Sequence, residues 1–311
     1  MSETIRITVV GLGSIGTSIA LALKKADPDT EITGHDREQS VARRARKEGA
    51  VDQADWNLIS ACEEADVTIL AIPFGEVKDT LVAAGPYFRA GCLVMDTCSA
   101  KSPVLRWADE NLGEGVNFVG GSPILRGGKR SPDADLFVGS LFCLCPSTSA
   151  SPESVGWASG LVRSIGARPF FIDAVEHDGV MAGVDHVPIL VAAALLRVSR
   201  GSAAWREGVR LGGSRFTGAT ASIVGDAVGH AGLVLANPES VVRWLDAFQA
   251  ELSELRGLIV NHEHDELGEA LKVAQDAREE WARSEVGAED EGPTFERGFR
   301  SLLMGDRGGK G

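Results

Sequence analysis

Cysteine is scarce in this sequence of 311 residues, and its five cysteines form no C-x-x-C pair. Four of them lie in or beside apolar runs that have the composition of strands. The odd number and the irregular spacing argue against the disulfide framework that is typical of small secreted proteins. We therefore expect buried thiols in a reducing compartment at Cys62, Cys92, Cys98, Cys143 and Cys145.

Positive charge is also in short supply, because 31 lysines and arginines stand against 44 aspartates and glutamates, for a net charge of −13. Such acidity argues against a surface that coats nucleic acid and against a polybasic membrane anchor. With 44% hydrophobic and 24% charged residues, the composition is that of an ordinary soluble globular protein. The length predicts two domains.

Long hydrophobic runs are missing as well. The apolar run at residues 5–10 has no basic segment before it and leads into a glycine turn, which indicates a first strand and not a signal peptide. The longest later run, residues 187–196, is too short to span a bilayer. We expect a cytoplasmic protein that makes no contact with membranes.

The first half of the sequence alternates between strand and helix patterns. Helices are predicted over residues 14–25 and 39–48, and short β-rich runs lie between the helix-length segments. This alternation predicts a parallel sheet with crossover helices. The predicted strands are residues 5–10, 31–36, 65–72, 92–96, 117–120 and 140–145, with a final one at 170–172.

The pattern changes after about residue 174, where strand signals become few and long apolar-periodic stretches predict helices. These helices are predicted over residues 180–198, 219–235, 241–260 and 265–283. The sequence thus predicts an α/β domain over residues 1–173, an all-α domain over 174–285 and a flexible tail over 286–311.

A glycine-rich motif follows the first predicted strand and opens the first predicted helix. It reads Gly11-Leu12-Gly13-Ser14-Ile15-Gly16, and Asp36 follows at the end of the second strand. In this context G-x-G-x-x-G is the fingerprint of a Rossmann dinucleotide-binding domain. Gly11 permits the tight turn, Gly13 the approach of a pyrophosphate to the helix N-terminus, and Gly16 the packing of helix on strand.

Asp36 predicts which dinucleotide is bound. Its carboxylate would accept hydrogen bonds from the adenosine ribose and repel a 2′-phosphate, which favours NAD over NADP. The adjacent Arg37 is able to pair with a 2′-phosphate, so NADP stays the less favoured alternative.

Further motifs, taken in order, resemble the prephenate/arogenate dehydrogenase (TyrA) family over residues 5–285. They are Ala65-Asp66-Val67 to Ala71-Ile72-Pro73, Asp96-Thr97-Cys98-Ser99-Ala100-Lys101, Phe118-Val119-Gly120-Gly121-Ser122-Pro123, Asp135-Leu136-Phe137-x-Gly139, His177-Asp178, Asp185-His186-Val187-Pro188 and Asn237. The resemblance implies a Rossmann domain followed by a helical domain through which two copies dimerise. It also implies an oxidative decarboxylation, in which a ring carbinol gives hydride to NAD while the ring carboxylate leaves as carbon dioxide.

The resemblance also implies roles for single residues. Ala71, Ile72 and Pro73 would line the cofactor site, Ser99 would lie near the nicotinamide and the reacting hydroxyl, and His186 would face the cleft. Simpler structural roles stay open at several of these positions. Ser99 is able to cap a following helix, His186 to be a core residue, and His177-Asp178 to mark a helix start.

Two positions depart from the family pattern. The family's G-x-H-P histidine, which accepts a hydrogen bond from the reacting hydroxyl, is replaced by Ser122, a far weaker base or else a plain loop residue. The family's substrate-anchoring arginine is replaced by Ala221. We hypothesise that Arg126 or Arg215, which flank the altered motifs, anchors a differently shaped anion.

The sequence thus predicts an NAD-dependent dehydrogenase of a small anionic, cyclic carbinol, with the occurrence of decarboxylation and of prephenate turnover left open. Alternatives are a relative that serves another metabolite and a non-catalytic NAD-binding protein. A β-hydroxyacid dehydrogenase or imine-reductase-like enzyme is disfavoured because residues 180–198 contain no lysine. No metal site is predicted, because the side chains of His262 and His264 do not face each other on a helix.

Overall fold

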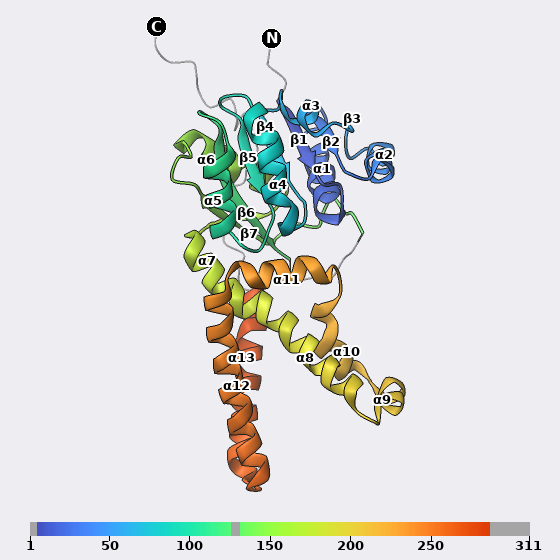
Figure 1. Cartoon of the computed structure of the whole chain (residues 1–311), viewed down its shortest axis with the longest axis vertical. Coiled ribbons are helices and arrows are strands. Elements are labelled where there is room, and N and C mark those ends of the chain that lie inside the picture. The colour runs from blue at the N-terminus through green and yellow to red at the C-terminus, as the bar shows by residue number, and fades with distance from the viewer. Residues whose placement is uncertain (1–4, 126–130, 287–311) are drawn as a thin grey trace. The chain divides into compact units, whose positions relative to one another are not determined.

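The computed structural model describes residues 5–125 and 131–286, which form two compact units, one up to Pro238 and one from Glu239. The first unit contains an eight-stranded sheet with helices on both faces and a set of further helices after it (Figure 1). The second unit contains two long helices. The predicted flexible tail lies outside the described residues, apart from Val286.

The sheet has the strand order β3-β2-β1-β4-β5-β6-β7-β8. Neighbouring strands are parallel, except that β6 and β7 are antiparallel. The strands are β1 (Arg6–Val10), β2 (Glu31–His35), β3 (Gln53–Ala54), β4 (Val67–Leu70), β5 (Leu93–Asp96), β6 (Asn117–Ile124), β7 (Leu141–Pro146) and β8 (Arg168–Phe171).

The prediction of an entirely parallel sheet was therefore wrong at one pair. A parallel connection needs a crossover, usually a helix, but residues 131–140 between β6 and β7 form turns. The strand β6 also extends four residues beyond its predicted end at residue 120. This extension places Ser122 inside a buried strand, opposite Cys143 of β7, and not in a loop.

Two apolar cores lie on opposite faces of the sheet, because successive residues of a strand point to opposite sides. Val9 and Leu93 belong to one core, and their neighbours Val10 and Val94 belong to the other. The helices around the sheet are α1 (Ser14–Ala26), α2 (Gln39–Lys47), α3 (Leu58–Cys62), α4 (Phe74–Ala84), α5 (Ser102–Asn111) and α6 (Pro152–Ser164), with a 3₁₀ turn η1 at Gly85–Tyr87. The α1 and α6 helices pack on the first core and α4 and α5 on the second.

The chain after β8 is helical, as predicted. The first unit continues with α7 (Ala174–Met181), a π-helical turn η2 (Ala182–His186), α8 (Val187–Gly201), α9 (Trp205–Leu211), α10 (Ser214–Thr220), a 3₁₀ turn η3 (Ala221–Ile223) and α11 (Ala227–Ala236). The second unit holds α12 (Pro238–Val260) and α13 (His264–Val286). The single helix predicted over residues 219–235 is broken, because Gly225 has a φ of 133°, which no helix permits.

One continuous helical run, Ala174–Gly201, is long and apolar enough by composition to cross a membrane, with a mean hydropathy of 1.8. It is longer than the apolar run seen in the sequence because α7 and the π-helical turn precede α8. Core helices of soluble proteins have the same properties, so this composition alone is weak evidence for a membrane span.

Candidate functional site

The glycine fingerprint forms a tight turn between β1 and α1. Gly11 has a φ of +88°, and its N–H donates to the carbonyl oxygen of His35 at 2.8 Å. A Cβ at Gly11 would lie 2.4 Å from the carbonyl oxygen of Ala71, and one at Gly16 would lie 1.9 Å from that of Gly11. Both positions therefore require glycine for reasons of backbone packing.

The N-terminus of α1 fits a dinucleotide pyrophosphate. Gly13 is the N-cap and offers no side-chain bond to the first turn, and a Cβ placed on Gly13 would meet nothing within 4 Å. The hydroxyl of Ser14 is buried and has no hydrogen-bond partner among the described residues. Unfilled donors at a helix N-terminus with open space before them form an anion site, so the residues present fit the group that the fingerprint implies.

Asp36 is held rigidly beside this turn. Its Oδ2 accepts the backbone N–H of Leu12 at 2.8 Å, and its Oδ1 accepts that of Glu38 at 2.8 Å. A cavity of about 350 Å³ lies next to it and is lined by predicted cofactor residues, namely Gly11, Gly13, Asp36, Arg37, Ala71, Ile72 and Pro73. The structure thus brings most of the predicted cofactor set together, while the side chain of Leu12 is buried in the core.

The guanidinium group of Arg37 forms an ion pair next to this cavity. Its Nη1 donates to Oε1 of Glu76, in the first turn of α4, at 2.5 Å. No sequence pattern predicted that these two residues pair, because they are 39 positions apart.

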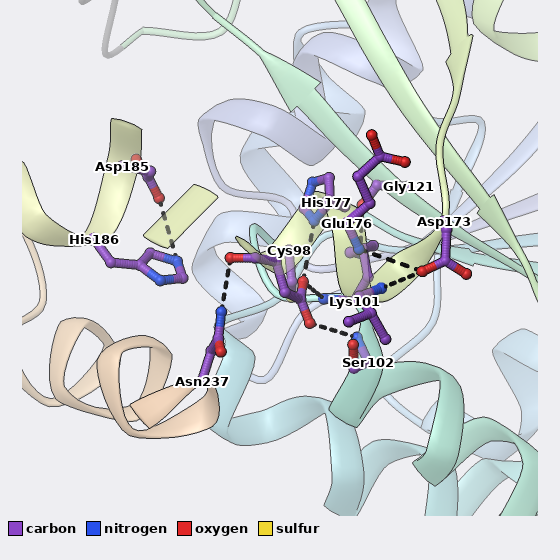
Figure 2. Close-up of polar contacts among 12 residues, drawn as sticks. Cys98, Lys101, Ser102, Gly121, Asp173, Glu176, His177, Asp185, His186 and Asn237 are labelled. Atoms are coloured by element: carbon purple, nitrogen blue, oxygen red, sulfur yellow. Dashed lines mark hydrogen bonds and ion pairs between the residues drawn. The ribbon is translucent and has the colours of Figure 1, made fainter. Parts of the chain in front are cut away.

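A second polar centre lies at the end of β5, beside β6. Lys101 is completely buried, and its Nζ donates to Oδ2 of Asp96 at 2.5 Å. The same Nζ donates to the carbonyl oxygen of Gly121 at 2.6 Å, and Figure 2 labels both of these residues. Oδ1 of Asp96 accepts the N–H of Gly121 at 3.0 Å. This network fixes the loop that carries Ser99 against the strand that carries Ser122.

Asp178 joins this loop to the helical part of the first unit. Its carboxylate accepts the N–H of Lys101 at 2.6 Å and that of Ser102 at 2.8 Å, and Nδ1 of His177 lies 3.1 Å away. Burial alone would raise the pKa of Asp178, but the hydrogen bonds from His177, Lys101 and Ser102 outweigh it and lower the pKa.

This arrangement corrects two of the structural alternatives considered above. Asp173, and not His177-Asp178, starts α7, because its carboxylate accepts the N–H groups of Val175 and Glu176. Ser99 does not cap α5, whose N-terminus is satisfied by Asp178.

His186 is the residue of the helical part with the most unusual surroundings. It ends the π-helical turn and is fully buried. Nε2 lies 3.7 Å from Oδ2 of Asp185 (Figure 2). Burial lowers the pKa of His186, and the carboxylates of Asp185 and Asp178, together with a hydrogen bond to the backbone of Ser99, oppose this only in part. The imidazole is therefore neutral near pH 7 and able to accept a proton.

The prediction of substrate contact stands differently for the two arginines, Arg126 and Arg215. Arg126 lies outside the described residues. Arg215 is exposed in α10 and lines a separate cavity of about 790 Å³, together with Val198, Trp205 and Phe216. The structure therefore does not place Arg215 among the residues that line the dinucleotide cavity.

Lys101 and Asp96 were quoted only as members of motifs, and Asp178 was interpreted only as part of a helix start, so the network that they form was not predicted. One signal in the sequence could have indicated a buried ion pair. Lys101 lies between apolar segments and follows Asp96, an aspartate at the end of a strand. No comparable signal existed for Asp178, because its partners lie 77 and 76 positions away.

The fold and this site define a dinucleotide-binding dehydrogenase with a helical second domain. The nucleotide-binding domain of prephenate dehydrogenase matches residues 19–170, and the dimerisation domain of prephenate dehydrogenase matches residues 173–273. The chain belongs to the prephenate dehydrogenase family. This confirms the predicted family, and the predicted fold class is confirmed with it.

Individual relatives support the same conclusion. The prephenate dehydrogenase of Lactococcus lactis is 31% identical over 256 residues, which cover 80% of this chain and 70% of that protein. The cyclohexadienyl dehydrogenase of Zymomonas mobilis is 27% identical over 88% of this chain and 94% of its own length. The prephenate dehydrogenase of Aquifex aeolicus, solved with hydroxyphenyl propionate and NAD⁺, has the same fold, with a TM-score of 0.82 at 24% identity over 89% of this chain and 98% of that one.

Proposed function

We propose that this chain is an NAD-dependent dehydrogenase that oxidises a small, anionic, cyclic carbinol of the prephenate and arogenate class. The observation that carries the proposal is the dinucleotide cradle, with the open space at Gly13, the unpartnered hydroxyl of Ser14 and the fixed carboxylate of Asp36. The names of the Lactococcus and Zymomonas relatives support this substrate class.

The chain's residues would hold the cofactor at both ends of its adenosine diphosphate. The N-terminus of α1 binds the pyrophosphate, and Asp36 accepts hydrogen bonds from the ribose hydroxyls. When bound, NAD supplies the hydride acceptor. Ala71, Ile72 and Pro73, which follow β4, border the same cavity.

His186 is the proposed acceptor of the carbinol proton. The family histidine of the G-x-H-P motif is Ser122 here, and a hydroxyl is a poor base near pH 7. The neutral imidazole of His186 has the basicity that Ser122 lacks. Ser99 and Ser122 would orient the reacting hydroxyl by hydrogen bonds, and the Asp96–Lys101 network holds their segments in place.

An anionic substrate also needs a cation, because the family's anchoring arginine is Ala221 in this chain. Arg126 follows the last residue of β6, Ile124, by two positions and so comes shortly after Ser122 in the chain. Arg215 lines a different cavity. We therefore favour Arg126 as the substrate anchor.

A homodimer in the cytoplasm is the proposed state of the enzyme. The matched dimerisation domain carries exposed apolar residues in both units, among them Val198 and Leu211 in the first and Leu252, Ile259 and Leu271 in the second. Exposed apolar surface of this extent is typical of a surface that binds another protein. A molar mass near twice 32.8 kDa in light scattering is expected.

The test of the proposed function follows the absorbance of reduced nicotinamide with NAD and the purified chain, offered prephenate, arogenate and their saturated analogues in turn. Turnover of prephenate or arogenate supports the proposal, and carbon dioxide release then shows whether decarboxylation accompanies hydride transfer. Turnover of a saturated analogue alone would indicate a relative that serves another metabolite.

A non-catalytic NAD-binding protein is the second candidate, favoured by the replacement of both the family histidine and the family arginine. It predicts measurable NAD binding without an absorbance change for any compound of the panel. The same experiment therefore separates the two candidates.

A further inference from the structure

The ion pair between Arg37 and Glu76 belongs to the wall of the dinucleotide cavity. Arg37 directly follows Asp36, and Glu76 lies in the first turn of α4. Nη1 of Arg37 and Oε1 of Glu76 are 2.5 Å apart, and both residues line the same cavity as Gly11 and Gly13. The pair connects the end of β2 with the start of α4 beside the carboxylate that would hold the ribose.

The charges around this pair decide which anions the cavity accepts. Asp36, Glu38 and Glu76 are the carboxylates of the lining, and Arg37 and Arg44 are its guanidinium groups. Arg44 has no ion-pair partner among the described residues, whereas Arg37 is engaged by Glu76. A ribose 2′-phosphate carries a charge of about −1.5 to −2, so the single guanidinium of Arg44 neutralises it only in part.

Glu76 is therefore placed to control the availability of Arg37. Were Glu76 neutral, Arg37 and Arg44 would both be free to pair with a phosphate. The N-terminus of α4, an 11-residue helix, would add partial positive charge to them. The carboxylate of Glu76 offsets both the guanidinium and the helix dipole.

We propose that Glu76 determines the cofactor specificity of this chain by withholding Arg37 from the 2′-phosphate of NADP. This inference rests on the proposed function, because it requires a dinucleotide in the cavity. It adds a residue of α4 to the discrimination, which Asp36 alone would otherwise provide.

The pair contributes little to folding, because the side chains of Arg37 and Glu76 are 73% and 38% exposed. Variants at these positions are therefore expected to fold. Glu64 offers a matched control, since it forms a comparable surface pair with Arg6 at 2.8 Å, at the start of β1 and outside the cavity lining.

The experiment measures the Kd of NAD and of NADP by isothermal titration calorimetry, on the full chain and on its E76Q and E64Q variants. The Kd of E76Q for NADP is expected to fall about fivefold, since an exposed charge pair acts through a solvent-screened Coulomb interaction. Its Kd for NAD is expected to stay within about twofold, because NAD has no charge at that position. E64Q is expected to bind both cofactors as the unaltered chain does.

The role of Arg37 is tested in an R37A background. If Glu76 acts by withholding Arg37, the E76Q change in R37A should improve NADP binding by less than about twofold, because no guanidinium is released. An equal improvement in both backgrounds would overturn the inference. So would a folded E76Q protein with an unchanged ratio of the two Kd values. Failure of the unaltered chain to bind either dinucleotide overturns the proposed function itself, a result distinct from tight NAD binding with an unchanged ratio.

Discussion

The carboxylate of Asp178 accepts the backbone N–H of Lys101 at 2.6 Å, although the two residues are 77 positions apart. Its second oxygen accepts the N–H of Ser102 at 2.8 Å, so one side chain of α7 satisfies two donors at the start of α5. Nδ2 of Asn237 donates in turn to the carbonyl oxygen of Asp178 at 2.7 Å. Asp178 therefore joins the loop with Ser99 to the helical segment that leads to His186.

Because Asp178 connects these two segments, we expect the substitution Asp178→Asn to destabilise the protein. The amide keeps the size of the side chain but loses its charge, and its NH₂ group then faces one of two backbone donors. A free energy of unfolding lower by about 2 kcal/mol is expected, since hydrogen bonds to a charged, buried acceptor are lost. Urea denaturation at pH 7 followed by circular dichroism measures it. Asp79→Asn, at an exposed position of α4, is the control and should change little.

The pH dependence of the same variant gives a second readout. Because the folded pKa of Asp178 is lowered, its contribution to stability is present above the unfolded value of about 3.9 and is lost as pH falls through the folded value. The difference between the unaltered chain and D178N should therefore shrink below about pH 4. A difference that stays constant from pH 7 to pH 3 would contradict the assignment of Asp178 as an ionised cap.

The neutral state of His186 predicts the pH profile of the reaction. Because burial lowers its pKa, the rate constant kcat/KM should stay level as pH falls to about 6.5 and decline only below that value. Initial rates with the substrate that turns over provide the profile. Loss of the imidazole in His186→Gln should lower kcat by about a hundredfold or more, as expected for a general base. A decline that begins well above pH 6.5, or a fully active H186Q, would show that another group takes the proton.

Stability gives a check on His186 that needs no substrate. A lowered folded pKa means that the unfolded chain takes up a proton first, so the free energy of unfolding falls as pH drops below about 6.5. The H186Q variant lacks this contribution. The unaltered chain should therefore lose more stability than H186Q between pH 7 and pH 5.

The parts of the fold that depend on local sequence were predictable. The turn at Gly11 and the strand β4 follow from patterns within a few residues, and the helical character of the second half follows from apolar periodicity. The antiparallel pairing of β6 with β7 was not predictable in this way. The strand signal in the sequence ended at residue 120, so it did not indicate that β6 continues to Ile124 and pairs with β7.

In the candidate site too, the residues of local motifs were predictable and the contacts between distant positions were not. The cofactor residues lie in one motif and at the strand ends that adjoin it, so spacing alone placed Asp36 beside the fingerprint. Asp178 and Glu76 act on residues 77 and 39 positions away, and no short-range pattern reports such contacts. Arg215 directly precedes the altered motif that begins at Phe216, yet α10 places it beside α8 and α9. Nearness in sequence to an altered motif therefore did not predict nearness in space.

The two arginines proposed as substrate anchors are expected to behave differently. Loss of a guanidinium that binds a substrate carboxylate costs about 2 kcal/mol or more, so Arg126→Ala should raise KM by about thirtyfold with a smaller effect on kcat. Arg215→Ala should leave KM within about twofold, because Arg215 lines another cavity. Steady-state kinetics on both variants decide the point. A larger effect at Arg215 than at Arg126 would show that α10 reaches the substrate, for instance from a second subunit.

The open space at Gly13 gives the sharpest test of the dinucleotide cradle. Gly13 has a φ of −68°, which alanine adopts without strain, and a Cβ there meets no atom within 4 Å. Gly13→Ala should therefore fold, with a Tm lower by only a few degrees because alanine is a poorer N-cap than glycine. Its methyl group would nevertheless occupy the space that a pyrophosphate needs at the start of α1. The Kd for NAD is expected to rise by about tenfold or more, because the closest phosphate contacts of the fingerprint are lost.

Gly75→Ala, at a helical position of α4 that also has no neighbour within 4 Å of a Cβ, is the matched control and should bind NAD normally. Unchanged NAD binding in a folded G13A protein would mean that the pyrophosphate does not lie against α1, and the cofactor site would have to be sought elsewhere in the first unit.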